Sequence, residues 1–449
     1  MTAPKGVFYF LFLPLFAVSC FLSTAHAEDP SIDLSASMDP TYTSWSDIST
    51  AAVPATHSYL TQRSTLNLKI TEKPWVLNFR LENIAVVGSG ALPAQLDGLS
   101  SRYPKPGGAF FLSQAYFLYS GFLRARPARF EAGFLPLNIG HGLLFSDNDL
   151  GVMGIHGTLE RWGPFDLEVG GGNTKTNAAP ENDLFGFVLA NLSGMGAWQI
   201  GFLPEIDRTP RALNSGQTAG KTRRNNILVA YNQNFNHEFF LSLEAIASGG
   251  SYFLANTAPL QKIETKGSAF SIEGGWKTVI PKLESVGPVD FQFTYTQGSG
   301  DKSNTTKDES FFSANATRFN GLERTGWGQY LGASTFDALG SSATWNGLPQ
   351  GLSGISVYGL ALKTKPYRFL SLPTRIGTGF YKFRASESSN GRSKDLGSEW
   401  SLGFQTELNQ RFNAKLDYFN FGPGAAYEES GQKAKAVGGV KLKLSLSFL

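Results

Sequence analysis

The sequence predicts an all-β fold, a transmembrane antiparallel β-barrel of about 18 strands of the outer-membrane type. Three observations predict it: an export-like N-terminus, repeated alternation of apolar and polar residues, and connections that alternate between short and long. The alternation is clearest in residues 440–449, Val-Lys-Leu-Lys-Leu-Ser-Leu-Ser-Phe-Leu. A single strand of this kind would leave its backbone groups unpaired in a bilayer, so it requires a closed barrel.

The N-terminus predicts the compartment. Lys5, the apolar run that ends at Leu22 and the small-residue pattern Ala25-His26-Ala27 are typical of a secretory signal peptide. We therefore expect residues 1–27 to be cleaved and residues 28–449 to form one barrel in a Gram-negative-type outer membrane. Cys20 leaves a lipoprotein cleavage site open as an alternative. It is the single cysteine, so the mature chain forms no intrachain disulfide and no thiolate metal site.

Composition narrows the function classes. After residue 27 no apolar run approaches the ~20 residues of a transmembrane helix. The 50 glycines and 36 phenylalanines favour β structure. Lys5 is the only charged residue of the first 27, which leaves 38 basic against 36 acidic side chains. This near balance predicts no nucleic-acid partner.

The remaining strands are predicted in chain order from the same alternation. The clearest runs, in which apolar side chains face outward and polar ones inward, are residues 65–71, 76–83, 239–246, 270–277, 289–297 and 399–408. With weaker runs added, the predicted number of strands is about 18, and single-chain bacterial barrels have an even number of strands.

The connections support the barrel independently, because such barrels alternate short periplasmic turns with long external loops. The predicted short connections are residues 71–74, 162–164, 193–196, 234–237 and 409–410. The predicted long ones are residues 39–64, 84–110, 136–154, 204–225, 247–268 and 298–352. The last contains several aromatic residues, so we expect it to fold over or into the barrel mouth.

Outward-facing aromatic residues cluster near the predicted periplasmic ends of the strands. They are Trp75, Trp198, Tyr231, Trp276 and Phe448. Aromatic girdles occupy this position in membrane barrels.

A barrel of this strand number encloses a water-filled lumen, and inward side chains then decide what passes. The pore-lining candidates are Lys69, Arg80, Glu82, Asp290, Glu399, Lys415, Asp417, Lys441 and Lys443. The alternative is that these charges merely pair with one another across strands. Sequence leaves both interpretations open.

The sequence gives little support for a catalytic site or a metal site. His141, Ser146 and Asp147 share one predicted loop, but no nucleophile elbow surrounds the serine. Asp147-Asn148-Asp149 lacks the glycine and the distant glutamate of a calcium loop. We therefore expect no catalytic residues, no metal site and no cofactor, and hence no enzyme.

Two stretches resemble the alginate export family of outer-membrane barrels. The C-terminal signature is matched by residues 395–399 (Asp-Leu-Gly-Ser-Glu), 408–409 (Leu-Asn), 413–416 (Asn-Ala-Lys-Leu), 418–419 (Tyr-Phe) and 421–427 (Phe-Gly-Pro-Gly-Ala-Ala-Tyr). The early strand pair is matched by residues 113–116 (Ser-Gln-Ala-Tyr), 130–134 (Phe-Glu-Ala-Gly-Phe) and 138–145 (Asn-Ile-Gly-His-Gly-Leu-Leu-Phe). The resemblance implies 18 strands and an arginine-lined lumen that conducts an anionic polysaccharide. Phe134 stands where the family usually has arginine, so that residue's role does not carry over.

Together these features favour a channel for a polar solute. The solute is either a small molecule or an anionic polysaccharide such as alginate exporters carry. The implied partners are outer-membrane lipid, the solute and periplasmic export components. Two other classes stay open: an outer-membrane hydrolase that acts through loop residues, and an adhesion or assembly barrel with a closed lumen. The sequence does not fix the solute, its direction, gating or the oligomeric state.

Overall fold

The computed structural model describes most of the chain after residue 29. The described residues are 30–46, 56–88, 107–123, 125–146, 151–174, 183–194, 196–208, 211–212, 218–236, 238–254, 261–279, 288–302, 307–311, 313–314, 327–331, 348–349, 351–364, 367–369, 372–388, 391–428 and 431–448. The predicted signal peptide and Asp147-Asn148-Asp149 lie outside these residues. Within them, no helix has the length and apolar character needed to cross a bilayer.

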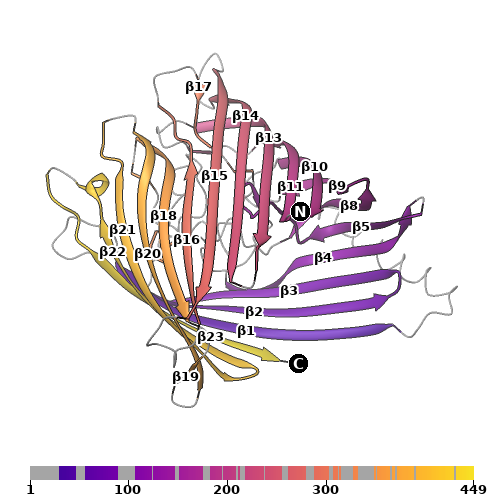
Figure 1. The fold of residues 1–449 in the computed structure, drawn as a ribbon, viewed down its shortest axis with the longest axis horizontal. Coiled ribbons are helices and arrows are strands. Elements are labelled where there is room, and N and C mark those ends of the chain that lie inside the picture. Colours follow the sequence, from indigo (N-terminus) through magenta and orange to yellow (C-terminus); the bar gives the residue numbers. More distant parts are fainter. Residues whose placement is uncertain are drawn as a thin grey trace, which may run out of the picture.

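Eighteen long antiparallel strands form the wall in the described part of the chain (Figure 1). They are β1 (Ser31–Ser46), β2 (Thr56–Glu72), β3 (Trp75–Gly88), β4 (Gly107–Leu123), β5 (Arg126–Leu135), β8 (Val152–Trp162), β9 (Phe165–Thr174), β10 (Asp183–Gly194), β11 (Gly196–Asp207), β13 (Thr218–Asn234), β14 (Phe239–Leu254), β15 (Lys262–Thr278), β16 (Val289–Gly298), β18 (Leu352–Thr364), β20 (Leu372–Ser388), β21 (Asp395–Asn409), β22 (Phe412–Pro423) and β23 (Val437–Phe448).

Short elements decorate the connections. They are β6 (Asn138–Ile139), β7 (Phe145–Ser146), β12 (Arg211–Ala212), β17 (Lys307–Asp308), β19 (Tyr367–Phe369) and the 3₁₀ turn η2 (Ala425–Tyr427).

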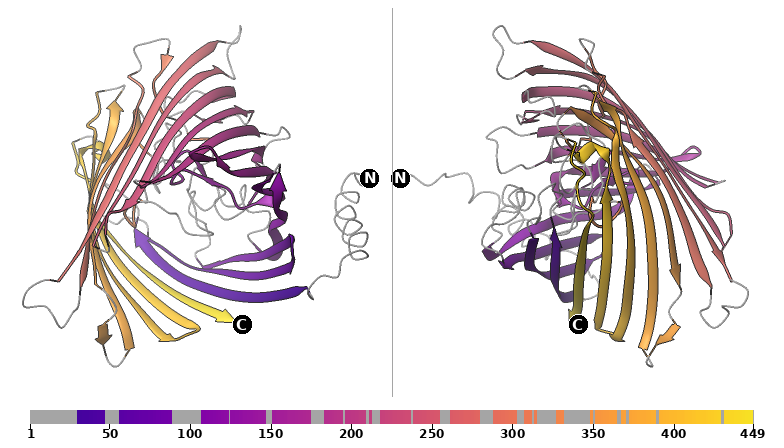
Figure 2. Two further views of the ribbon diagram at one scale, coloured as in Figure 1. Left: turned by 45° about the vertical axis from the view of Figure 1, so that its right-hand side comes forward. Right: turned by 90° about the vertical axis from the view of Figure 1, so that its left-hand side faces the viewer.

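The wall is closed by pairing of the last strand with the first. β23 runs antiparallel to β1, from Trp45 opposite Gly439 to Ala36 opposite Phe448, so neither strand is left with an open edge (Figure 2). Closure satisfies the backbone groups of both strands, which a membrane span requires. The predicted barrel of about 18 strands is confirmed.

The strands form because their residues alternate between two environments. Along β23, Val440, Leu442 and Phe448 are 36%, 39% and 45% exposed and face outward, whereas Lys441 and Lys443 face the lumen. The same pattern leaves many large apolar side chains exposed on the outer surface, among them Phe293 and Leu360. A surface of this kind suits lipid rather than water.

The connections alternate as the sequence predicts. Short turns, such as residues 73–74 between β2 and β3 and residues 410–411 between β21 and β22, lie at one end, here called the short-turn end. Longer connections lie at the other, the long-loop end. The first strand begins at Ser31 and the last strand ends at Phe448, and both residues lie at the short-turn end.

Several long connections are shorter than predicted, because the strands continue past the expected ends. The connection predicted over residues 39–64 is reduced to residues 47–55. The strand extensions are polar on their inner face, where Thr41 and Thr61 are buried and paired in register. A polar lumen weakens the alternation at this end, so the sequence pattern placed the strand ends too early.

The predicted aromatic girdle is present at the short-turn end. Trp75 stacks on Phe117 with ring centroids 4.7 Å apart, and Trp198 packs against Tyr231 at 4.5 Å. Trp276 is 54% exposed on the outer face.

Apolar packing fills part of the lumen toward the long-loop end. Two stretches fold inward: residues 136–146, here the first lumenal segment, and the described residues between 299 and 351, here the second lumenal segment. Phe145 of the first packs on Phe185 of the wall, and Tyr330 of the second stacks on Phe421. The Ala314 N–H donates to the Leu144 carbonyl at 3.1 Å and so joins the two segments.

Candidate functional site

The candidate site is the lumen wall below the two lumenal segments. Inward basic side chains lie on four strands that flank β1, namely β22, β23, β2 and β3, and are here called the basic strip. It consists of Arg63, Arg80, Lys415, Lys441 and Lys443, with Lys69 farther toward the short-turn end, all on lumen-facing positions by register.

Three lysines form the centre of the basic strip. Lys415 lies directly opposite Lys443 on the neighbouring strand, and Lys441 lies opposite Asp417. The Lys415 Nζ is 2.8 Å from Asp417 Oδ2, and the Lys415 side chain remains 44% exposed. Like charges directly opposite each other destabilise a sheet. Asp417 is the carboxylate that the β22–β23 register places among these three ammonium groups, and Asp39 of β1 is two residues from Thr41, the register partner of Lys443.

Arg80 and Glu82 belong to a second charge cluster. The Glu82 carboxylate is fully buried, accepts from Arg63 Nη2 at 2.9 Å, and forms an ion pair with Arg80, whose Nε lies 2.9 Å away. Glu82 therefore sits within the wall between two guanidinium groups. Sequence reasoning missed Arg63 because it assigned this residue to a connection rather than to a strand.

Lys69 and Asp290 lie near the short-turn end on different parts of the wall. Lys69 is exposed on β2 and faces Asp33 in register, and Asp290 on β16 lies between the register positions of Lys277 and Lys363. The structure does not bring these two candidates together with the lysines of β22 and β23.

Glu399 has a different environment from the other candidates. It is 1% exposed, and it accepts the backbone N–H groups of Gln329 and Tyr330 of the second lumenal segment, the latter at 2.8 Å. Glu244 does the same for the first lumenal segment, since it accepts the His141 N–H at 3.0 Å. Alternation predicted that Glu399 faces inward, but it could not show that loop backbone covers it.

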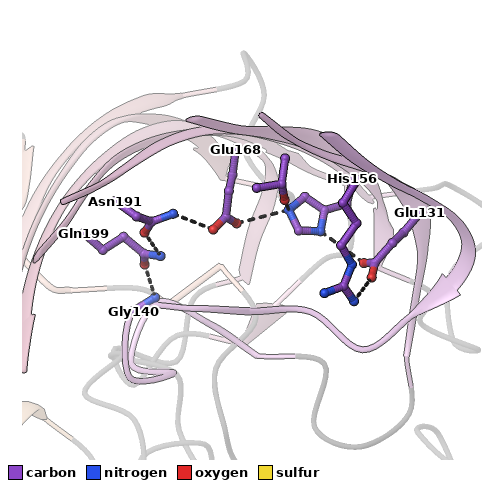
Figure 3. Close-up of polar contacts among 8 residues, drawn as sticks. Glu131, Gly140, His156, Glu168, Asn191 and Gln199 are labelled. Carbon is purple, nitrogen blue, oxygen red and sulfur yellow. Dashed lines mark hydrogen bonds and ion pairs between the residues drawn. The ribbon is translucent and has the colours of Figure 1, made fainter. Parts of the chain in front are cut away.

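A polar network links the neighbouring strands β5, β8, β9, β10 and β11 (Figure 3). At its centre His156 of β8 lies between two carboxylates, with Nδ1 3.2 Å from Glu131 Oε2 and Nε2 3.1 Å from Glu168 Oε2. Arg129 of β5 also donates to Glu131. Glu131, His156 and Arg129 were not among the pore-lining candidates.

The network continues to the first lumenal segment through two amides. Asn191 of β10 donates to Glu168, and Gln199 of β11 donates through Nε2 to Asn191 Oδ1 at 2.9 Å. The Gly140 N–H then donates to Gln199 Oε1 at 2.7 Å. These four residues, Glu168, Asn191, Gln199 and Gly140, are here called the amide relay.

Acidic and basic side chains thus differ in how they meet the lumen. The buried carboxylates Glu82, Glu131, Glu244 and Glu399 accept hydrogen bonds from the protein itself. Most members of the basic strip keep part of their side chain exposed. Asp33, Asp39 and Asp290 also occupy lumen-facing positions and are not fully buried, so both signs of charge face the lumen, and the lysines of β22 and β23 are concentrated on one part of the wall.

The residues considered for catalysis are not assembled. The His141 imidazole lies 2.9 Å from Ser242 Oγ, and burial lowers the pKa of His141. Ser146 is buried at the far end of the same segment, where it pairs in register with Asn138. In the part of the chain that the structure describes, no three His, Cys, Asp or Glu side chains are grouped as metal ligands.

Comparison with solved structures gives outer-membrane barrels of Pseudomonas aeruginosa. OccK8 (OprE) superposes with a TM-score of 0.51 at 12% identity, over 93% of this chain and 98% of that one. OccK3 (OpdO) gives 0.51 at 11% identity, over 93% and 96%. No family model and no curated protein matches the chain. At this identity the likeness shows the fold alone, an 18-stranded barrel shared with outer-membrane porins.

Proposed function

We propose that this protein is an outer-membrane channel that passes a polar, negatively charged solute. The observation that carries the proposal is the basic strip, in which Lys415 faces Lys443 across two neighbouring strands and Lys441 adjoins them. Placing like charges opposite one another costs stability. A passing anion offsets that cost.

The shape of the lumen supports a narrow path rather than a wide pore. The lumenal segments fill the space toward the long-loop end, where Trp45, Tyr59 and Phe419 join their core. The lysines of the basic strip lie just below, since Lys441 is two residues from Gly439, the register partner of Trp45. A solute that passes the segments would meet the lysines next.

The resemblance to alginate exporters favours a saccharide acid as the solute, either small or polymeric. The barrel likeness supports a transport role, and it gives no support to alginate itself. Outer-membrane lipid and periplasmic export components are the partners this proposal implies, with the leader of residues 1–27 cleaved on export. N-terminal sequencing of the mature protein tests the cleavage, and it also shows whether Cys20 is retained.

Reversal potentials in planar bilayers under a potassium chloride gradient test the proposal. We expect anion selectivity, and we expect Lys443→Glu to reduce it. Lys266→Glu is the matched control, because Lys266 is an exposed lysine on the outward parity of β15. Cation selectivity of the wild-type protein, or equal effects of the two variants, would refute the assignment.

A closed barrel with an adhesion or assembly role is the second candidate. The filled upper lumen is the observation that favours it. Absence of conductance at every voltage and in every solute would support it over the channel.

A further inference from the structure

The amide relay has a direction. Gly140 donates to Gln199, Gln199 donates to Asn191 and Asn191 donates to Glu168, so every donor points toward the same carboxylate. Each side-chain amide accepts a hydrogen bond through its oxygen and donates one through its nitrogen. Rotating either amide by 180° would place two donors or two acceptors opposite each other. A chain with this uniform direction and an anion at its end is strengthened cooperatively.

His156 supplies the positive charge at the far end of the relay. Both ring nitrogens lie within hydrogen-bond distance of a carboxylate oxygen, 3.2 Å from Glu131 and 3.1 Å from Glu168. An ionised carboxylate only accepts. Both nitrogens must therefore carry a proton for both contacts to be favourable, which makes the ring an imidazolium.

The groups around the ring come from three neighbouring strands and its own. β5 contributes Glu131 and Arg129, β9 contributes Glu168, and the Thr158 hydroxyl of β8 is 3.4 Å from Nε2. The Phe187 ring of β10 covers the imidazole at 5.6 Å between centroids. Arg129 already neutralises Glu131, so the imidazolium is the cation that compensates Glu168.

The first lumenal segment receives the other end of the relay. Gly140 lies between Ile139, which is fully buried, and His141, whose N–H is held by Glu244. The apolar core holds the segment in the lumen, and the relay fixes its position along the wall. Losing the relay should therefore shift or loosen the segment without unfolding the barrel.

We propose that His156 is a positioning residue: held between Glu131 and Glu168, it fixes the first lumenal segment through the amide relay. Removing the proton leaves a lone pair facing one of the two carboxylates, so that contact becomes repulsive. Glu168 then turns away and Asn191 loses its acceptor, so the hydrogen bonds of Gln199 and Gly140 no longer lead to an anion. The segment gains freedom at alkaline pH. If the proposed channel function also holds, this motion changes conductance.

Spin labelling measures the segment directly, whether or not the barrel conducts. Asn138→Cys places a label at an exposed position of the segment, in a Cys20→Ala background that leaves no other cysteine. We expect His156→Gln to shorten the rotational correlation time of the label on the order of twofold. Alkaline pH should do the same in the parent, and it should have little further effect in His156→Gln.

Two further variants separate charge from packing. His156→Arg restores a permanent cation that donates to both carboxylates, so it should return the label toward parent mobility and remove the pH response. Ile155→Val changes the outer face of the same strand, where Ile155 is 57% exposed, and leaves the relay intact, so it should leave mobility unchanged. A label equally immobile in the parent and in His156→Gln across the pH range would overturn the proposal.

Conductance recorded on the same proteins distinguishes the two proposals. A label that responds to His156→Gln in a barrel that never conducts would keep the positioning role and reject the channel. A channel whose conductance and label mobility both ignore His156→Gln would keep the channel and reject the positioning role.

Discussion

The Glu399 carboxylate on β21 accepts the backbone N–H of Tyr330 at 2.8 Å, and the Tyr330 hydroxyl in turn donates to the Ser46 carbonyl at 2.8 Å. One residue of the second lumenal segment thus joins two distant parts of the wall. The position of that segment depends on a wall carboxyl group, because a buried backbone N–H that loses its acceptor costs free energy.

Glu399→Gln should release the second lumenal segment. A buried donor left without its acceptor costs about 1–3 kcal/mol, and the amide keeps one acceptor but turns an N–H toward backbone donors. We expect faster hydrogen exchange at residues 329–331 and a lower midpoint of denaturant unfolding. Glu407→Gln, an exposed glutamate on the same strand, should change neither. Unchanged exchange in Glu399→Gln would contradict the anchoring role.

Glu82→Gln should destabilise the wall and increase anion selectivity together. It leaves Arg63 and Arg80 without their shared carboxylate, and breaking a buried pair from one side costs about 3–5 kcal/mol. The unfolding midpoint and the reversal potential report the two effects. Adding Arg80→Gln to Glu82→Gln should restore part of the stability and reduce the extra anion selectivity, because it removes one of the uncompensated cations. Additive effects would show that the two side chains are not coupled.

Gly140→Ala and Gly163→Ala form a matched pair for the first lumenal segment. Both glycines have a positive φ, 65° and 69°. A Cβ on Gly140 would clash with the Glu244 carboxylate, whereas a Cβ on Gly163 would meet nothing within 4 Å. Gly163→Ala should cost only the strain of the left-handed backbone, about 1–2 kcal/mol. Gly140→Ala should cost more and should mobilise the label at Asn138, and equal costs would contradict the close packing.

Acidification should tighten the docking of the second lumenal segment near Asp308. Burial, the largest cause, raises the pKa of Asp308 above its usual 3.8, although the Ser310 N–H and the Tyr252 hydroxyl lower it. The folded group holds its proton more tightly than the unfolded one. Its contribution is therefore fully present below the unfolded pKa and is lost as pH rises through the folded pKa.

Hydrogen exchange at residues 307–311, corrected for intrinsic rates, should thus slow as the pH falls from neutral toward that range. Asp308→Asn should remove the dependence, since it leaves no ionisable group at this position. A response to pH that persists in Asp308→Asn would assign the effect elsewhere.

The barrel was predictable because its signal is local. Alternation of apolar and polar residues, as in Val440 to Phe448, decides which side of a strand meets lipid, and it requires no knowledge of distant residues. The strand ends were less predictable. Arg63 lies in a polar extension of β2, where both faces are hydrophilic enough that alternation fades.

For the lumen, the sequence predicted only which side chains face inward. Parity placed Glu399 and Glu82 on the inner face correctly, but their contacts depend on residues far away in sequence, such as Tyr330 and Arg63. His156 and Gln199 carry no distinctive motif, since their roles arise from five strands brought into register. Contacts of this kind depend on the closed wall, and no sequence spacing encodes them.

The anchors of the lumenal segments bind main-chain N–H groups rather than side chains. Glu399 holds Gln329 and Tyr330, and Glu244 holds His141, through atoms that every non-proline residue possesses. Apart from Gly140, the buried apolar contacts and the side chains that bond to the wall, such as Tyr330 and Asp308, the residues along these segments are therefore free to change during evolution while their placement stays the same. Substitutions on the surfaces of the inner segments can then change which solutes the barrel accepts, while the strands of the wall stay the same.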